Sequence, residues 1–250
     1  MISSLEHLFS RIKVTVYLRP QRDLWMSLYS QCAKGMNVLP SHSSWGTPEY
    51  CGKEIYEHGM YYVNVLDGYR QASNKIDIDA RIYDRSLFPN QDVVSDFTSS
   101  CKLNKDRLGI PSNINSNESL DWKAVEFSKA LATYFRSDAT RRKKIASVMR
   151  QGFVDARKHG YGEWIGKSPN YLTESEQDAI YEYYAANNKH LSAEHFNSAT
   201  IFEMDSHLPV NPYSIDNIPS EEKQALAGFM LTKLDDEDIR NALSHLRILI

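Results

Sequence analysis

A polar segment at residues 102–121 divides the chain into two parts of different character. The segment contains a proline, a glycine and four asparagines, a composition typical of a connection rather than of a helix or a strand. A chain of 250 residues can form one large domain or two small ones. We therefore predict two domains, 1–101 and 122–250, joined by a linker at 102–121.

The part before the segment has the patterns of both strands and helices. Residues 12–18 alternate enough to be a strand, and residues 23–33 have apolar side chains at helical spacing. Residues 61–66 are rich in strand-forming residue types. In residues 76–82, isoleucine and alanine alternate with charged residues, and Tyr83 continues the polar positions of this alternation. These patterns predict a mixed α and β region in which 61–66 and 76–82 form a β-hairpin with one solvated face.

The part after the segment contains one helical pattern after another. Residues 122–135 and 140–158 have helical spacing, and Thr173-x-x-Glu176 is a capping box that predicts a helix running to about Asn187. Acidic residues after Ser220 and at 235–238 favour the first turns of two more helices. The predicted fold class is therefore α+β, with an all-helical C-terminal domain.

Composition narrows the classes of protein that the chain can belong to. Its net charge of −3 excludes a uniformly basic nucleic-acid binder, and no apolar run reaches the roughly 18 to 20 residues of a membrane span. The three cysteines, at 32, 51 and 101, form no disulfide framework or metal pair. No signal-like run opens the chain. We expect a cytoplasmic protein without membrane partners, although an effector secreted without a signal has the same features.

The predicted helix at 140–158 is strongly basic. Residues 136–167 contain nine Lys or Arg against three Asp or Glu, and Lys143, Arg150 and Arg157 are seven residues apart, which places them on one stripe. Such a stripe can follow the phosphates of RNA. The alternative is a solvated face that pairs with the acidic C-terminal helices of the same chain. The candidate nucleic-acid-binding residues are Arg141, Arg142, Lys143, Lys144, Arg150, Arg157 and Lys158.

The last predicted helix combines an apolar stripe with a polar arc. At 100° per residue, Ile239, Leu243, Leu246 and Ile250 form the apolar stripe, and Arg240, Asn241 and His245 lie on the arc beside it. Ile248 falls in the middle of that arc. An apolar residue at this position indicates that another helix or a second subunit covers the arc.

Arg240-Asn241-x-x-x-His245 resembles the signature of the HEPN superfamily, small all-α domains of which many are metal-independent ribonucleases. The resemblance covers the motif and the helical character of residues 118–250. It implies that His245 acts in acid–base chemistry at a ribose hydroxyl or the leaving oxygen, that Arg240 holds the scissile phosphate and that Asn241 orients their partners. It also implies a homodimer in which two motifs face each other through the C-terminal helix. Imidazole and guanidinium suit those roles.

Two functional hypotheses follow from these patterns. The first is a metal-independent endoribonuclease or RNA-binding protein of toxin or defence type, which needs no metal and no cofactor. The alternative is a non-enzymatic protein that binds another protein, such as an inhibitor, adaptor or complex subunit of bacterial or phage origin.

Four other constellations carry weaker chemical signals. Asp77-x-Asp79 resembles the metal-binding pair of nucleotidyltransferases, but Tyr69 follows Gly68 where those enzymes need a Gly-Ser turn. His190-x-x-x-Glu194-His195 has one residue too many for a zinc-protease string. A thiol dyad of Cys32 or Cys51 with His42 or His58 lacks an activating context, and the run Glu203, Asp205 and His207 is typical of a surface. We expect no metal site at any of them.

Overall fold

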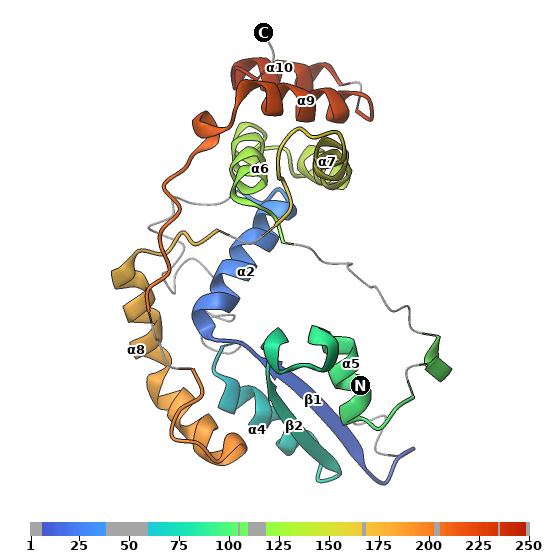
Figure 1. Cartoon of the computed structure of the whole chain (residues 1–250), viewed down its shortest axis with the longest axis vertical. Helices are drawn as coiled ribbons and strands as arrows, with labels where there is room; N and C mark the ends of the chain where they lie inside the picture. Colours follow the sequence, from blue (N-terminus) through green and yellow to red (C-terminus); the bar gives the residue numbers. More distant parts are fainter. Residues whose placement is uncertain are drawn as a thin grey trace. The chain divides into compact units, whose positions relative to one another are not determined.

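The computed structural model describes residues 7–38, 60–104, 106–109, 119–166, 169–202, 206–234 and 236–248. It confirms the α+β class, with a small parallel sheet near the N-terminus and a helical C-terminal region (Figure 1). None of the described helices combines the length and the apolar character that crossing a membrane requires.

The described residues form two compact units, each built from three stretches of sequence. Unit 1 lies within Met1–Leu24, Pro48–Asn115 and Gln177–Ser206, and unit 2 lies within Trp25–Thr47, Ser116–Glu176 and His207–Ile250. The predicted domains follow composition, whereas the units follow contacts, so the two divisions differ at 25–47 and at 177–206. Much of the predicted linker at 102–121 lies outside the described residues.

The sheet of unit 1 consists, in the described residues, of β1 (Ile12–Leu18) and β2 (Ile76–Ile82). The strands run parallel, with Ile12 opposite Ile76 and Leu18 opposite Ile82. Both strands were predicted, but the β-hairpin is wrong, because residues 61–66 belong to the helix α4 (Tyr62–Ala72). Parallel neighbours need a long crossover between them, and α4 belongs to that crossover.

Packing explains why α4 is a helix despite its strand-forming residues. Tyr62, Val63 and Leu66 are buried together, which is the spacing of one helical face. Their burial outweighs the weak preference of valine and tyrosine for strands. The core beneath the sheet also receives Leu191 from the end of α8 (Glu174–Leu191), and its buried members are Leu18, Tyr62, Val63, Leu66, Leu191 and Phe202.

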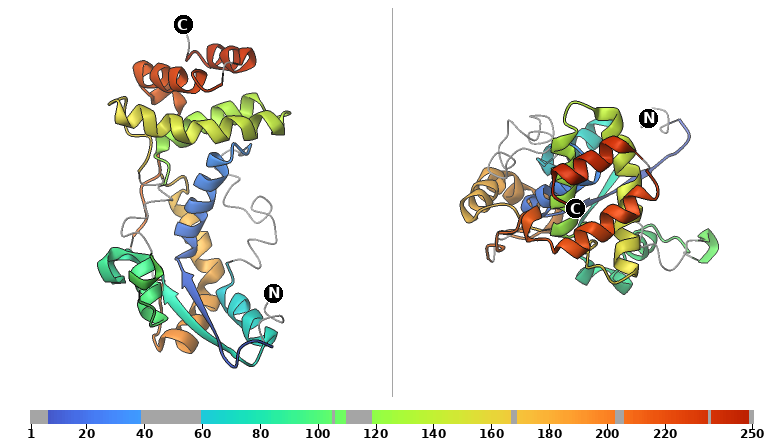
Figure 2. Two further views of the ribbon diagram at one scale, coloured as in Figure 1. Left: turned by 90° about the vertical axis from the view of Figure 1, so that its right-hand side faces the viewer. Right: turned by 90° about the horizontal axis from the view of Figure 1, so that it is seen from above.

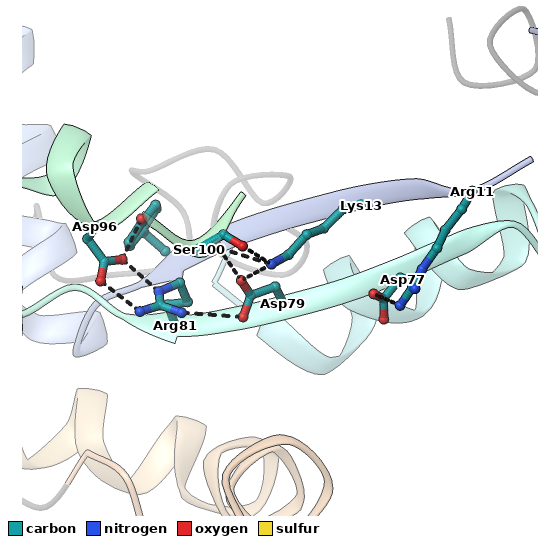
Figure 3. A network of polar contacts seen from close by, with 8 residues as sticks. Arg11, Lys13, Asp77, Asp79, Arg81, Asp96 and Ser100 are labelled. Atoms are coloured by element: carbon teal, nitrogen blue, oxygen red, sulfur yellow. Dashed lines mark hydrogen bonds and ion pairs between the residues drawn. The ribbon is translucent and has the colours of Figure 1, made fainter. Parts of the chain in front are cut away.

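The opposite face of the sheet is polar and contacts α5 (Val93–Ser100). The predicted alternation of 76–82 is confirmed on the apolar side, where Ile78, Ala80 and Ile82 pack against the core. On the other side α5 approaches through Asp96 and Ser100, which contact the charged side chains of the strands (Figure 3). The predicted solvated face is therefore partly covered by hydrogen-bonded polar groups.

Unit 2 is helical in its described residues. Its helices are α6 (Trp122–Tyr134), α7 (Ala139–Lys158), α9 (Ser220–Leu231) and α10 (Glu237–His245), together with most of α2 (Gln21–Lys34). Helices α9 and α10 form a layer against α6 and α7 (Figures 1 and 2). The helices expected at 122–135, at 140–158 and near the C-terminus are thus confirmed.

Side-chain caps explain where these helices begin. Asp121, Asp138 and Asp236 each accept a hydrogen bond from a backbone N–H of the first turn that follows, which satisfies donors that have no partner within the helix. The predicted capping box is also present. The Thr173 N–H donates to Glu176 Oε2 over 2.7 Å, and the Glu176 N–H donates to Thr173 Oγ1 over 3.3 Å.

Candidate functional site

The predicted motif lies on α10, with its three named side chains exposed. Ile239, Ala242 and Leu243 are buried on the inner face of this helix, while Arg240, Asn241 and His245 face outward. The helical wheel therefore assigned the motif to the correct side of α10.

The wheel was wrong at Ile248, because α10 ends at His245. The Arg247 N–H donates to the Ser244 carbonyl over 2.9 Å, and the Ile248 N–H donates to the Leu243 carbonyl over 2.8 Å. With φ of +54° at Arg247, these bonds form a Schellman motif. The turn folds Ile248 back so that 1% of it is exposed. Its burial needs no second subunit, and the homodimer stays a prediction that rests on the family resemblance.

His245 occupies the last position of α10 beside an aromatic ring of α6. The ring centroids of His245 and Tyr134 are 5.3 Å apart with planes inclined by 54°. Both residues are exposed, so a ligand can reach the imidazole from solvent.

The seven basic candidates on α7 divide into two groups, and the first group has partners inside unit 2. Arg141 pairs with Asp238 over 2.5 Å and Lys144 with Asp236 over 3.7 Å, both at the start of α10. Arg142 donates to the carbonyl of Phe135 over 2.9 Å and to that of Arg136. The predicted alternative, pairing with the acidic C-terminal helices, thus applies to Arg141 and Lys144, while Arg142 caps the end of α6.

The second group, comprising Lys143, Arg150, Arg157 and Lys158, is exposed. Arg157 pairs with Glu163 over 3.1 Å, but both side chains are largely in solvent, so the pair contributes little to stability. In the part of the chain that the structure describes, Lys143 and Lys158 have no ion pair. Opposite them α7 buries Ile145, Met149, Gly152, Phe153 and Ala156.

One cation of this surface was missed in the sequence. Burial and then the charge of Arg150 lower the pKa of Lys34, which indicates that the last turn of α2 brings Lys34 close to α7. The two residues are more than a hundred positions apart, and the sequence contains no pattern that pairs them.

The two aspartates of the nucleotidyltransferase-like pair are bound by cations of the protein itself (Figure 3). Arg11 contacts Asp77 over 2.5 Å, and Lys13 contacts Asp79 over 2.9 Å. Burial would raise the pKa of Asp79, but hydrogen bonds from Ser100 and Lys13 outweigh it and hold that pKa below its usual value. Asp77 and Asp79 therefore belong to a row of ion pairs on the polar face of the sheet.

The zinc-like string is brought together at the end of α8, around an arginine. Arg70 of α4 contacts Glu194 and lies 3.1 Å from His195 Nε2, while His190 Nε2 lies 3.4 Å from Glu194. Burial and the charge of Arg70 lower the pKa of His195. Within the described ranges no group of three His, Cys, Asp or Glu side chains is arranged to hold a metal ion. The cation that the Glu194 carboxylate binds here is the Arg70 guanidinium.

Several of the remaining candidate residues lie outside the described residues: His42, Cys51, His58, Glu203 and Asp205. Cys32 and Cys101 are free thiols. Burial raises the pKa of Cys32 more than a hydrogen bond involving Asn37 lowers it, which disfavours the reactive thiolate.

Comparisons of the chain with family models, curated proteins and solved structures found no match.

Proposed function

We propose that unit 2 binds RNA through the exposed cations of α7 and cleaves it without a metal at Arg240, Asn241 and His245. The observation that carries the proposal is the exposure of all three motif side chains on α10. They belong to the same unit as Lys143 and Lys158, which have no ion pair among the described residues. A motif whose histidine were buried against a backbone carbonyl would have no such access to a substrate.

The chemistry assigns one role to each side chain. The 2′-hydroxyl of the ribose is an internal nucleophile, and His245 exchanges a proton with it or with the leaving oxygen. Arg240 offers paired N–H donors to the scissile phosphate, and Asn241 orients the reacting groups. The products are a 2′,3′-cyclic phosphate and a 5′-hydroxyl, because the ribose oxygen attacks the adjacent phosphorus and the next nucleoside leaves.

Replacing His245 by alanine is expected to reduce RNA cleavage by at least about a hundredfold, because general acid–base catalysis contributes that much or more. The measurement is cleavage of a labelled RNA by the full chain in EDTA, with the product ends identified as cyclic phosphates. His7→Ala, which removes an exposed histidine of unit 1, is the matched control and should cleave normally. Undiminished cleavage by a folded His245→Ala variant would contradict the proposal.

A second candidate function, protein binding, is favoured by the apolar surface of unit 1. The exposed leucine and phenylalanine side chains of the described residues all belong to this unit: Leu8, Phe9, Leu87, Phe97, Leu103 and Leu108. Exposed apolar side chains that lie together in one patch mark surfaces that bind other proteins, so this candidate requires several of these residues to form such a patch.

This candidate predicts no cleavage of RNA by the wild-type chain and a bound protein that is lost when Leu87 and Phe97 are replaced by lysine. The measurement compares what wild-type and variant chains retain from the same extract, with unchanged helical content as the check on folding. Identical retention by both chains would argue against this surface.

A further inference from the structure

A short loop after α7 holds an exposed tyrosine on a fixed backbone. The Tyr161 N–H donates to the Ala156 carbonyl over 2.9 Å, and the Gly160 N–H donates to the Arg157 carbonyl over 3.1 Å. These two bonds, with φ of +78° at Gly160, form a Schellman motif. The buried Trp164 then donates its indole N–H to the Tyr161 carbonyl over 2.7 Å. The position of Tyr161 is thus set from both sides.

Three aromatic rings meet at this loop. The ring centroids of His159 and Phe229 are 5.2 Å apart with planes inclined by 33°, and those of Tyr161 and Phe229 are 6.3 Å apart. Tyr161 is 43% exposed, His159 is exposed and Phe229 is half-buried. We call His159, Tyr161 and Phe229 the aromatic platform. Two of its rings, those of His159 and Tyr161, are in solvent.

Basic residues lie next to the platform in the sequence. Arg157 and Lys158 directly precede it on α7, and Lys233 follows Phe229 by four residues in the turn that ends α9. Lys158 and Lys233 are exposed and have no ion pair among the described residues. Ring faces beside cations are the combination with which proteins hold single-stranded nucleic acids, because the rings stack on bases while the cations attract phosphates.

We infer that the aromatic platform binds unpaired bases of the RNA, so that unit 2 selects single-stranded over double-stranded substrate. This inference rests on the proposed RNA binding by α7. In a duplex both faces of each base are covered by neighbouring bases, so a protein ring can stack only on a base that has left the helix. A partner protein would not need the exposed cations that precede His159 and follow Phe229 in the sequence.

The test measures binding of the full chain to labelled 2′-O-methyl RNA, which lacks the attacking hydroxyl, as a single strand and as a duplex. Tyr161→Ala, alone and with His159→Ala, is expected to weaken single-strand binding about tenfold or more, since one stacked base contributes that much. Duplex binding and the salt dependence should not change. Tyr161→Phe should bind normally, as should Tyr181→Ala, a matched exposed tyrosine of unit 1.

A charge variant separates failure of this inference from failure of the proposed function. Replacing Lys143 and Arg150 by glutamate should weaken single-strand and duplex binding alike and reduce the salt dependence. If it does so while Tyr161→Ala changes neither the single-strand nor the duplex affinity, or changes both equally, the inference about the aromatic platform is overturned and the proposed RNA binding stands. If the wild-type chain binds neither RNA, or the charge variant changes nothing, the proposed function fails as well.

Discussion

Gly162→Ala is expected to lower the free energy of unfolding by about 3 kcal/mol, although it adds one methyl group to a surface loop. Gly162 has φ of +87°, a conformation that costs an alanine about 1 kcal/mol or more. A Cβ there would lie 1.9 Å from Glu222 Oε2. The carboxylate must move to make room, which disturbs its hydrogen bonds of 2.6 and 2.9 Å from Lys123 Nζ. The side chains of Lys123 and Glu222 are both largely shielded from solvent.

Gly160→Ala is the matched control for this prediction. Gly160 also has a positive φ, +78°, but no atom lies within 4 Å of the added Cβ, so only the backbone cost of about 1 kcal/mol remains. In a chain that carries Glu222→Ala, Gly162→Ala should cost no more than Gly160→Ala. Urea unfolding of the wild-type chain and the four variants measures these differences. Equal losses at Gly160 and Gly162 in the wild-type background would refute the role of the carboxylate.

Sequence patterns predicted the helices of unit 2 because their signals are local. The apolar spacing lies within each helix, and the aspartates that cap α6, α7 and α10 lie within a turn of the helix starts. The sequence did not reveal that Gly162 makes room for Glu222, because that contact joins positions sixty residues apart.

Sequence patterns failed where distant segments decide the structure. The alternation of 76–82 predicted a strand, but the choice of β1 as its partner depends on a crossover that leaves no periodic signal. Residues 61–66 form a helix because their neighbours bury one helical face. Ile248 was misplaced because the helix α10 ends in a turn with Arg247 in a left-handed conformation. Glycine or asparagine usually occupies this position, so an arginine there gave no sequence signal for the end of the helix.

The candidate site shows the same division. The helical wheel assigned Lys143, Arg150 and Arg157 to an exposed stripe, because that assignment needs only the period of the helix. Which cations already have partners depends on where other helices lie: α10 takes up Arg141 and Lys144, and α2 adds Lys34. The aromatic platform combines the end of α7 with a ring of α9, and proximity along the sequence does not reveal that contact.

Arg81→Ala is expected to destabilise the protein by about 3 kcal/mol at neutral pH, because it leaves a buried carboxylate without its cation. Asp96 is 3% exposed and receives hydrogen bonds of 2.6 and 2.7 Å from Arg81 (Figure 3). This loss of about 3 kcal/mol is at the lower end of the range for breaking a buried ion pair, because a third of the Arg81 side chain is exposed. Arg11→Ala, which removes the exposed pair with Asp77, should cost no more than about 1 kcal/mol.

The pH dependence identifies the cause of that loss. Burial would raise the pKa of Asp96, but the hydrogen bonds from Arg81 and Tyr17 outweigh it and hold that pKa below its usual value. In the wild-type protein this contribution is therefore present above a pH of about 4, the usual value for an unfolded aspartate, and is lost as the pH falls through the lowered pKa.

Without Arg81, burial dominates and the pKa of Asp96 rises above that of the unfolded chain. The deficit of the variant should then shrink as the pH falls from 7 towards 4, because the carboxyl takes up a proton and the buried charge disappears. Adding Asp96→Asn to Arg81→Ala should recover stability at neutral pH for the same reason. A deficit that is constant between pH 7 and 4 would show that Arg81 contributes by packing rather than by neutralising Asp96.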